Sequence, residues 1–253
     1  MLKICTVYFD GYYTPDYVSK FYRSLKRNTT IPFEFICLSD TKDIEADVIL
    51  PYNKESDVKK HWHKLKFFSP QFAYQNPGDE IVVMDIDQVI TGNIDDLIGH
   101  PVKKNEFITY GHFWKSLIDI NGGFYKFKSG NFKYVWEDFI LNPNYWQNLY
   151  YNNGDVHFKY YGEQNYVNWK MLEHQVNIIR TPIEWLGKYT PNFEENIELN
   201  KQYAKKCKTD YMIMDSVNEM IKVVHFTGVG KTIHKYKDNF INEYWKWQLI
   251  GLK

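Results

Sequence analysis

The sequence has little of several features that define large classes of proteins. Its 253 residues include three cysteines, widely spaced and odd in number, which form no CxxC or Cys/His cluster. This pattern argues against a zinc site and against a disulfide framework. There is no excess of either charge, because Lys+Arg and Asp+Glu both number 31. The balance argues against a protein that coats nucleic acid.

Long hydrophobic runs are also missing. No apolar stretch reaches the roughly 18 residues needed to span a bilayer, and residues 1–7 lack the apolar core of a signal peptide. Alanine occurs at only three positions and arginine at only three, a bias typical of AT-rich coding in a low-GC bacterium or a virus. We therefore expect a cytoplasmic protein of a bacterial cell or a virus-infected host cell, with no transmembrane segment.

What the sequence does contain is typical of a folded domain. Hydrophobic residues make up 44% and charged residues 25% of the chain, and the length favours one domain over two. Strand-like and helix-like segments alternate over the first hundred residues, which predicts an α/β fold built from βαβ units. The expected strands are Lys3–Phe9, Phe33–Leu38, Asp47–Leu50 and Ile81–Met84. The expected helices run from Thr14 to about Asn28 and over the segment His61–Phe72, where the helix is expected to stop near Pro70.

Two carboxylates follow the last of these strands. Ile81–Met84 is continuously apolar, as expected of a strand buried in the middle of a parallel sheet. Ligands of open α/β sheets bind at the carboxyl ends of the strands, where Asp85 and Asp87 lie two residues apart and leave the chain on the same side. Such a pair relieves its repulsion by binding a proton or a cation such as Mg²⁺ or Mn²⁺. The alternative is a pair of turn residues that cap the strand.

In its context, the segment 81–97 resembles the metal-binding DxD block of the GT-A-fold glycosyltransferases. The nearest pattern is glycosyltransferase family 8, which includes glycogenin-like and lipopolysaccharide galactosyltransferases, together with related bacterial and phage transferases. The resemblance implies a single GT-A domain over residues 1–253, with a mixed central sheet and helices on both faces. It also implies a nucleotide-binding half at about 1–100, ending in the DxD, and a donor-sugar and acceptor half at about 101–253.

Three more patches of the resemblance precede the DxD block, and one of them, residues 35–40, resembles the second strand and its terminal acid. The loop that begins Tyr12-Tyr13-Thr14 follows the first strand, where similar enzymes hold the nucleotide base. Tyr12 or Tyr13 is the candidate, although either can be a packing tyrosine. The segment Trp62–Phe68 resembles the helix written WxKLxLF in similar chains. In it, Lys64 can meet a phosphate or a donor-sugar hydroxyl, or can be an ordinary surface lysine.

Two patches after the DxD block carry the implied sugar site. Residues 120–127, beginning Ile120-Asn121-Gly122-Gly123, resemble the strand whose Asn121 faces the donor sugar and whose Gly123 admits it closely. Residues 162–165 resemble the family's G-D-Q segment, with Glu163 in place of the usual Asp. Glu163 and Gln164 are the catalytic candidates, as an acid and an amide near the anomeric carbon.

The last patch, residues 223–231, resembles the family signature H-x-x-G-x-x-K-P-W. By this resemblance His225 is the third metal ligand beside Asp85 and Asp87, Lys231 contacts the diphosphate, and Gly228 lets the backbone approach it. A histidine after a strand can equally be a core residue. Thr232 and Ile233 stand where the family has Pro-Trp.

Together these patches imply a Mn²⁺- or Mg²⁺-dependent transferase. The donor is a nucleotide-diphosphate sugar, expected to be a UDP-sugar, and the acceptor is a glycan, lipid-linked or protein hydroxyl. Family 8 implies retention of anomeric configuration; if the enzyme inverts instead, Glu163 or Asp155 is the candidate base.

Several alternatives stay open. Residues 85–89 also fit the D-x-D-x-[TV] motif of haloacid-dehalogenase-type phosphatases, with residues 212–215 as a poor second acid segment. A catalytically inactive, sugar-binding GT-A protein is the other alternative. Residues 184–218 can form an acceptor side, a lid or a solvated cover. The aromatic tail 242–250 can rest on a membrane surface or pack on its own domain.

Overall fold

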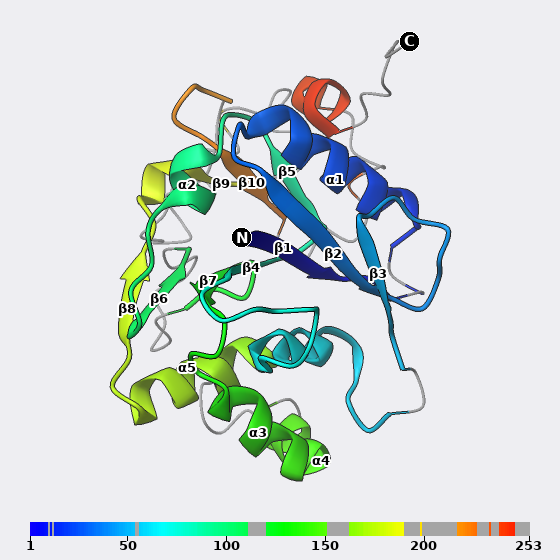
Figure 1. Ribbon diagram of the computed structural model, residues 1–253. Helices are drawn as coiled ribbons and strands as arrows, with labels where there is room; N and C mark the ends of the chain where they lie inside the picture. Colours follow the sequence, from blue (N-terminus) through cyan, green and yellow to red (C-terminus); the bar gives the residue numbers. More distant parts are fainter. Residues whose placement is uncertain are drawn as a thin grey trace.

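The computed structural model describes residues 1–9, 11, 13–53, 56–110, 120–150, 162–189, 198, 217–226, 233 and 238–245. Its centre is a seven-stranded sheet with the strand order β3-β2-β1-β4-β7-β6-β8 (Figure 1). The strands are β1 (Leu2–Val7), β2 (Phe33–Ser39), β3 (Val48–Pro51), β4 (Glu80–Met84), β6 (Glu106–Thr109), β7 (Phe124–Lys128) and β8 (Asn177–Arg180). The four strands predicted from the sequence are all present, with ends shifted by one or two residues.

The strand β4 lies at the junction of the two halves of this sheet. On one side it pairs with β1 in parallel, and β1, β2 and β3 continue as a parallel unit. On the other side it pairs with β7 in an antiparallel ladder, followed by β6 and β8. The apolar run 81–84 is therefore central, as predicted, but one of its two neighbours is antiparallel. The predicted mixed α/β sheet is confirmed.

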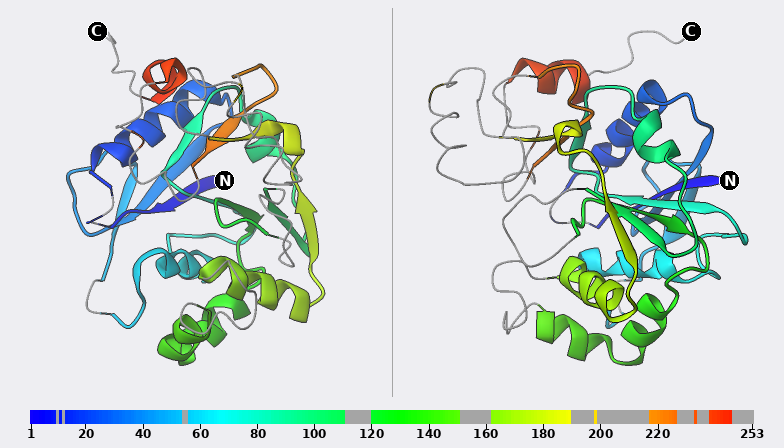
Figure 2. Two further views of the ribbon diagram at one scale, coloured as in Figure 1. Left: turned by 180° about the vertical axis from the view of Figure 1, so that it is seen from behind. Right: turned by 90° about the vertical axis from the view of Figure 1, so that its left-hand side faces the viewer.

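Helices cover both faces of the sheet, as predicted (Figures 1 and 2). Alternate residues of β4 face opposite sides: Val82 and Met84 belong to one hydrophobic cluster, and Ile81 and Val83 to another. The first cluster includes the apolar face of α1 (Asp16–Asn28), and the second packs against η1 (Lys60–Phe68). Because each buried aliphatic side chain contributes roughly 1.5–3 kcal/mol, both faces hold β4 in register.

The two helices predicted in the first hundred residues differ in outcome. The helix α1 buries Tyr17, Val18, Phe21, Tyr22, Ser24 and Leu25, and it ends at Asn28, where it was expected to end. The second segment is a 3₁₀ helix that ends at Phe68, close to Pro70, where the predicted helix was expected to stop. Ser69 is extended with ψ 120°, because a residue before a proline, here Pro70, disfavours helical backbone.

A second, three-stranded sheet brings residues 223–225 close to the segment that carries Asp85 and Asp87. It has the order β5-β10-β9, with β5 (Gln88–Ile90), β9 (Leu186–Lys188) and β10 (Val223–His225). The register of β10 pairs His225 with Gln88 on one side and with Lys188 on the other. Asp85, Ile86 and Asp87 are the link between β4 and β5, so His225 lies near the residue that follows this link.

The remaining helices flank these sheets. They are α2 (Asp95–Gly99), α3 (Tyr134–Leu141), α4 (Pro143–Asn148), α5 (Glu163–Glu173), η3 (Ile183–Trp185) and the π-helix η5 (Ile241–Trp245). The helix η5 packs on α1, with the rings of Tyr17 and Trp245 4.8 Å apart. The described part of the tail thus packs on its own domain.

Other sequence expectations fall partly within the described residues. Residues 184–188 of the unassigned segment belong to η3 and β9, and most of the rest lies outside the described residues. Cys5 and Cys37 are buried free thiols, and Cys207 lies outside. None of the helices in the described part of the chain combines the length and the apolar character that crossing a membrane requires.

Candidate active site

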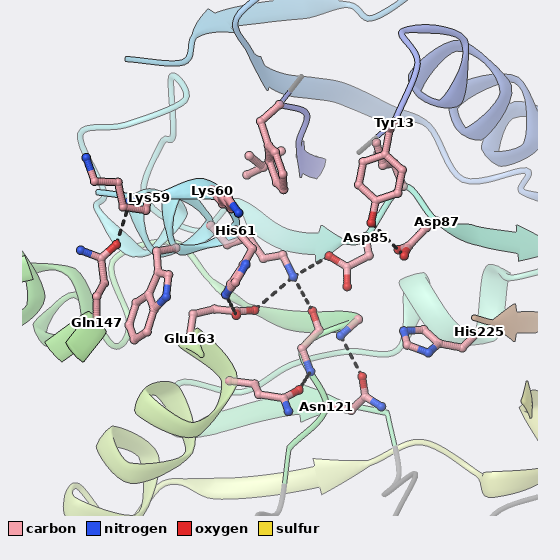
Figure 3. Close-up of a pocket in the computed structure, with 18 of the residues that line it drawn as sticks. Tyr13, Lys59, Lys60, His61, Asp85, Asp87, Asn121, Gln147, Glu163 and His225 are labelled. Atoms are coloured by element: carbon pink, nitrogen blue, oxygen red, sulfur yellow. Dashed lines mark hydrogen bonds and ion pairs between the residues drawn. The ribbon is translucent and has the colours of Figure 1, made fainter. Parts of the chain in front are cut away.

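A pocket of about 690 Å³ opens where β1 and β4 end. Figure 3 draws 18 of the residues that line it. The lining residues are Val7, Phe9, Tyr13, Lys59, Lys60, His61, Trp62, Lys64, Asp85, Ile86, Asp87, Asn121, Gly122, Gly123, Asn144, Gln147, Asn148, Glu163, Gln164 and His225. Nine residues that the sequence marked as site candidates therefore share one pocket: Tyr13, Lys64, Asp85, Asp87, Asn121, Gly123, Glu163, Gln164 and His225.

The other candidates cannot be placed. Tyr12, Gly228 and Lys231 lie outside the described residues, as do Asp155 and the segment 212–215. The remaining candidates are held by contacts with one another and with neighbouring residues.

The acid pair stands at the carboxyl end of β4. The Tyr13 hydroxyl donates to Asp87 Oδ2 at 3.0 Å, and the main-chain N–H of Asp85 donates to Gly123 O at 3.3 Å. Burial, together with the charge of Asp85, raises the pKa of Asp87 to about 7. The repulsion expected of two neighbouring carboxylates is thus present, and a proton or a cation relieves it.

Lys64 is a buried cation in the centre of the site. Its Nζ lies 2.5 Å from Asp85 Oδ1 and 3.1 Å from Glu163 Oε1, and it donates to Gly122 O at 3.0 Å. Burial alone would lower the pKa of Lys64, but the two carboxylates outweigh burial and raise it. The surface-lysine alternative is therefore wrong. Lys64 joins η1 to β4, to the turn before β7 and to α5.

Glu163 is held from two sides. Lys64 contacts one carboxylate oxygen, and His61 Nε2 lies 3.5 Å from the other. Burial raises the pKa of Glu163, but Lys64 and His61 more than offset this and lower it, so Glu163 stays ionised at neutral pH. Gly162 has φ +111°, and a Cβ there would lie 2.9 Å from His61 Nε2. Glycine at position 162 thus admits His61 to the carboxylate.

The turn before β7 is built by side-chain amides. Asn121 Oδ1 accepts from the N–H of Gly123 at 2.8 Å, and Gln164 Oε1 accepts from the N–H of Gly122 at 3.0 Å. Thr109 Oγ1 fixes the turn with two hydrogen bonds, because it accepts from the N–H of Asn121 and donates to the carbonyl of Asn121. The amide oxygens of Asn121 and Gln164 accept these main-chain hydrogen bonds, so the NH₂ group of each side chain is directed to donate to a ligand.

The imidazole of His225 is packed closely against this turn. Gln88 Nε2 donates to Gly123 O at 2.5 Å, and the Tyr110 hydroxyl donates to Gln88 Oε1 at 2.8 Å. Burial lowers the pKa of His225 to about 4, which keeps the ring in the neutral form that can bind a metal. A Cβ on Gly123 would lie 2.8 Å from His225 Nε2 and 3.0 Å from Gln88 Nε2.

Gly123→Ala is therefore expected to displace His225 and to lower donor turnover by at least about tenfold, because small misplacements in a site carry large rate penalties. Gly92→Ala is the matched control, since its Cβ would meet its nearest atom, Ile221 O, at an ordinary 3.4 Å. Steady-state kinetics of both variants check the prediction. Equal kinetics in Gly123→Ala and the wild type would contradict this packing.

Several residues in and around this site were not foreseen. His61 and Gln88 contact predicted residues directly, Tyr110 holds Gln88, and Lys188 is buried beside His225 in the register of β9 and β10. The one signal in the sequence was the spacing of His61, one 3₁₀ turn before Lys64. The others depend on strand pairings that no local pattern specifies.

The predicted metal ligands agree with a divalent cation in chemical type. Asp85 and Asp87 supply carboxylate oxygens, and His225 supplies a neutral imidazole. Among the described residues, however, no three His, Cys, Asp or Glu side chains lie close enough together to hold an ion. Asp85 instead contacts Lys64, and Asp87 accepts from Tyr13. The three predicted ligands thus line one pocket without forming a coordination sphere.

No protein-family profile and no curated protein sequence matches the chain. Solved structures do match it, and glycosyltransferases are among them. GlyE of Streptococcus pneumoniae TIGR4 is 12% identical with a TM-score of 0.62 over 98% of this chain, and LgtC, solved with donor and acceptor sugar analogues, is 12% identical with a TM-score of 0.57 over 92%. The bifunctional glycosyltransferase WbbM, in its apo form, is 13% identical with a TM-score of 0.54 over 95%.

The lengths of these proteins differ. This chain covers 90% of the LgtC chain but 60% of the GlyE chain and 49% of the WbbM chain. The identities are low, so the comparison concerns the fold. The chain has the fold of these glycosyltransferases, the GT-A fold that its sequence predicts.

Proposed function

We propose that the protein is a metal-dependent glycosyltransferase that moves a sugar from a nucleotide-diphosphate donor to a hydroxyl acceptor. The observation that carries this proposal is the acid pair Asp85 and Asp87 at the carboxyl end of β4, inside a pocket of a GT-A fold. The donor is expected to be a UDP-sugar. The acceptor class includes glycans, lipid-linked sugars and proteins.

The diphosphate of the donor belongs at the acid pair. In this proposal Asp85, Asp87 and His225 would hold Mn²⁺ or Mg²⁺, which would supply a Lewis acid for the charge of the leaving diphosphate. The raised pKa of Asp87 supports a cation there, since an ion next to both carboxylates removes their repulsion. Tyr13, from the loop after β1, borders the same end of the pocket and is the described candidate for the nucleotide base.

The donor sugar belongs between the turn before β7 and the start of α5. Asn121 and Gln164 present amide NH₂ groups there, and Glu163 is an ionised acceptor of hydroxyl hydrogen bonds. One oxygen of Glu163 is ion-paired with Lys64, the other lies 3.5 Å from His61 Nε2, and the pKa of Glu163 is lowered, so Glu163 is a weak base. An inverting reaction needs a carboxylate base, and the poor basicity of Glu163 therefore favours retention of configuration.

The phosphatase alternative is less well supported. In haloacid-dehalogenase-type proteins the strand that carries the acid pair normally comes first, whereas here β4 follows β1, β2 and β3. The alternative of an inactive, sugar-binding protein is distinguished from a transferase only by an activity measurement.

A screen of nucleotide sugars tests the proposal. UDP-glucose, UDP-galactose, UDP-N-acetylglucosamine and GDP-mannose are incubated with the protein and Mn²⁺, and release of the nucleoside diphosphate is followed. We expect slow hydrolysis of one donor, abolished by EDTA, with proton NMR showing an α-anomer first from an α-linked donor. Hydrolysis of p-nitrophenyl phosphate with no turnover of any nucleotide sugar would contradict the proposal.

A further inference from the structure

A histidine lines the pocket on the side opposite to the acid pair. In Figure 3, His61 and Glu163 face each other on one side, and Asp87 and His225 lie on the other. Under the proposed function the diphosphate lies at the acid pair, so C1 of the donor sugar, which is bonded to the diphosphate, points to that side. The side that His61 and Glu163 form then meets the part of the donor sugar that is remote from C1, around C4 and C6.

The neighbours of His61 hold its imidazole in this position. The ring atom Nε2 lies 3.5 Å from Glu163 Oε2, and glycine at position 162 leaves the space for it, since a Cβ there would lie 2.9 Å from the same nitrogen. The next residue, Trp62, is buried and stacks on Phe139 with the ring centroids 5.3 Å apart. The backbone that carries the imidazole is thus anchored in the core, although 35% of the His61 side chain is exposed.

The contact with Glu163 decides which ring nitrogen of His61 carries the hydrogen. Burial lowers the pKa of His61 more than Glu163 raises it, so at neutral pH the imidazole is neutral and has one N–H and one bare nitrogen. The Glu163 carboxylate, whose pKa is lowered, is ionised and can only accept hydrogen bonds. The nitrogen that faces it, Nε2, is therefore the one that carries the hydrogen, and Nδ1 is left as an acceptor.

This acceptor nitrogen is available to a ligand. Within the described part of the chain, His61 contacts the carboxylate of Glu163 and the ring of Trp62, and no hydrogen bond engages Nδ1. The buried ammonium of Lys64 is not a competing partner for the sugar, because it uses its three N–H donors on the two carboxylates and on Gly122 O. The side of the pocket remote from the acid pair therefore presents two neighbouring acceptors, a carboxylate and an imidazole nitrogen.

We infer that His61 determines which donor sugar the enzyme takes, because its Nδ1 accepts a hydrogen bond from a hydroxyl of the sugar beside the hydroxyl that Glu163 accepts. The inference rests on the proposed function for the identity of the pocket as a donor site. The substrate class is then a hexose with a free hydroxyl at C4 or C6. A sugar without this hydroxyl binds less well, since it leaves an acceptor in the pocket without its hydrogen bond.

Binding of donor analogues tests the inference without turnover. The nucleotide sugar that the screen identifies, UDP-glucose for example, is compared by calorimetry in Mn²⁺ with its 4-deoxy-4-fluoro and 6-deoxy-6-fluoro analogues and with the free nucleoside diphosphate. Fluorine replaces the hydroxyl with little change of size but cannot donate a hydrogen bond. The proteins compared are the wild type, His61→Ala, His61→Asn and the control His100→Ala, which removes an exposed histidine outside the pocket.

We expect at least one analogue to bind about fivefold or more weaker than the parent sugar in the wild type and in His100→Ala. In His61→Ala the difference at one of the two positions should fall to within about twofold, while the affinity for the free nucleoside diphosphate stays unchanged. That position, C4 or C6, carries the hydroxyl that His61 binds. His61→Asn, which places an acceptor oxygen close to the position of Nδ1, should retain part of the difference.

Three results would overturn the inference. The first is equal binding of the parent sugar and both analogues by the wild type, and the second is that every difference seen in the wild type survives in His61→Ala. The third is an equal loss of affinity for the sugar and for the free nucleoside diphosphate in His61→Ala, which would assign His61 a structural role alone.

These outcomes are distinguishable from failure of the proposed function. A protein that binds a nucleoside diphosphate and hydrolyses its sugar, but binds the parent and both analogues equally, would refute the inference alone. A protein that binds no nucleoside diphosphate in the presence of Mn²⁺ would refute the proposed function itself.

Discussion

Asp87→Ala is expected to lower the rate of sugar transfer by about 10²–10³-fold, the usual consequence of losing one preorganised contact to developing charge. Asp87 stands at the end of β4 and accepts from Tyr13, and its neighbour Asp85 is already paired with Lys64. Within the described part of the chain, Asp87 is therefore the one of the two acids that has no ammonium group in contact with it. The rate constant for turnover of the donor found in the screen, measured at saturating Mn²⁺, checks the prediction.

The fold of this variant should persist. Removal of one of two repelling carboxylates relieves strain, so the thermal midpoint of Asp87→Ala should equal or exceed that of the wild type. Asp43→Ala removes an exposed acid away from the pocket and is the control for unspecific charge effects. A folded Asp87→Ala protein with wild-type turnover would show that the acid pair does not serve the reaction.

The raised pKa of Asp87 also predicts how stability depends on pH. The folded state holds this proton up to about pH 7, whereas an aspartate in the unfolded chain loses it near pH 3.9. The folded state therefore binds more protons across this window, and the free energy of unfolding contributed by Asp87 falls as the pH rises from about 4 to 7. Asp87→Asn should remove that contribution. Urea unfolding in EDTA at pH 4.5, 6 and 7.5 should give a flatter dependence for the variant, and parallel profiles would contradict the assignment.

Lys64→Met is expected to be the most destabilising single change in the site. It leaves Glu163, which is buried, and Asp85, which is partly buried, without their shared ammonium. Removal of one partner of a buried ion pair lowers the free energy of unfolding by about 3–5 kcal/mol. Because Asp85 is partly exposed, we expect a loss near the lower end of this range. Urea unfolding measures the loss, and Lys66→Met on the same 3₁₀ helix is the matched control.

A second variant separates loss of charge balance from loss of packing. If the uncompensated charge of Glu163 is the cause, Lys64→Met/Glu163→Gln should recover about half or more of the lost stability, since the double change removes one of the two stranded charges. Two separate contacts would instead give additive losses. An unchanged midpoint in Lys64→Met alone would contradict the central role of this cation.

The parallel half of the sheet could be read from the sequence because its signals are local. The apolar run 81–84 is followed by an acid pair, and the apolar residues of α1 recur at helical spacing. Such patterns need no knowledge of distant partners. The helix at residues 60–68 and its stop near Pro70 were also predicted, but its 3₁₀ form was not, because its apolar spacing resembles that of an α-helix.

The contacts of the site were harder to predict, because they join residues far apart in the chain. Lys64 meets Glu163 across 99 positions, and His225 reaches the turn before β7 through the pairing of β10 with β5. The resemblance to a family located most of these residues but not their mutual contacts. In particular, nothing local indicated that Lys64 would neutralise Asp85, or that Gly162 would admit His61 to Glu163.

The most direct test of the account is calorimetric titration of the wild-type protein with UDP, GDP and CDP, each with and without Mn²⁺. We expect one of these nucleotides, namely UDP, to bind in a metal-dependent manner. This binding should be lost in Asp87→Ala but kept in Asp43→Ala. Absence of binding to every nucleoside diphosphate, with Mn²⁺ present, would contradict the claim that this pocket holds a nucleotide-sugar donor.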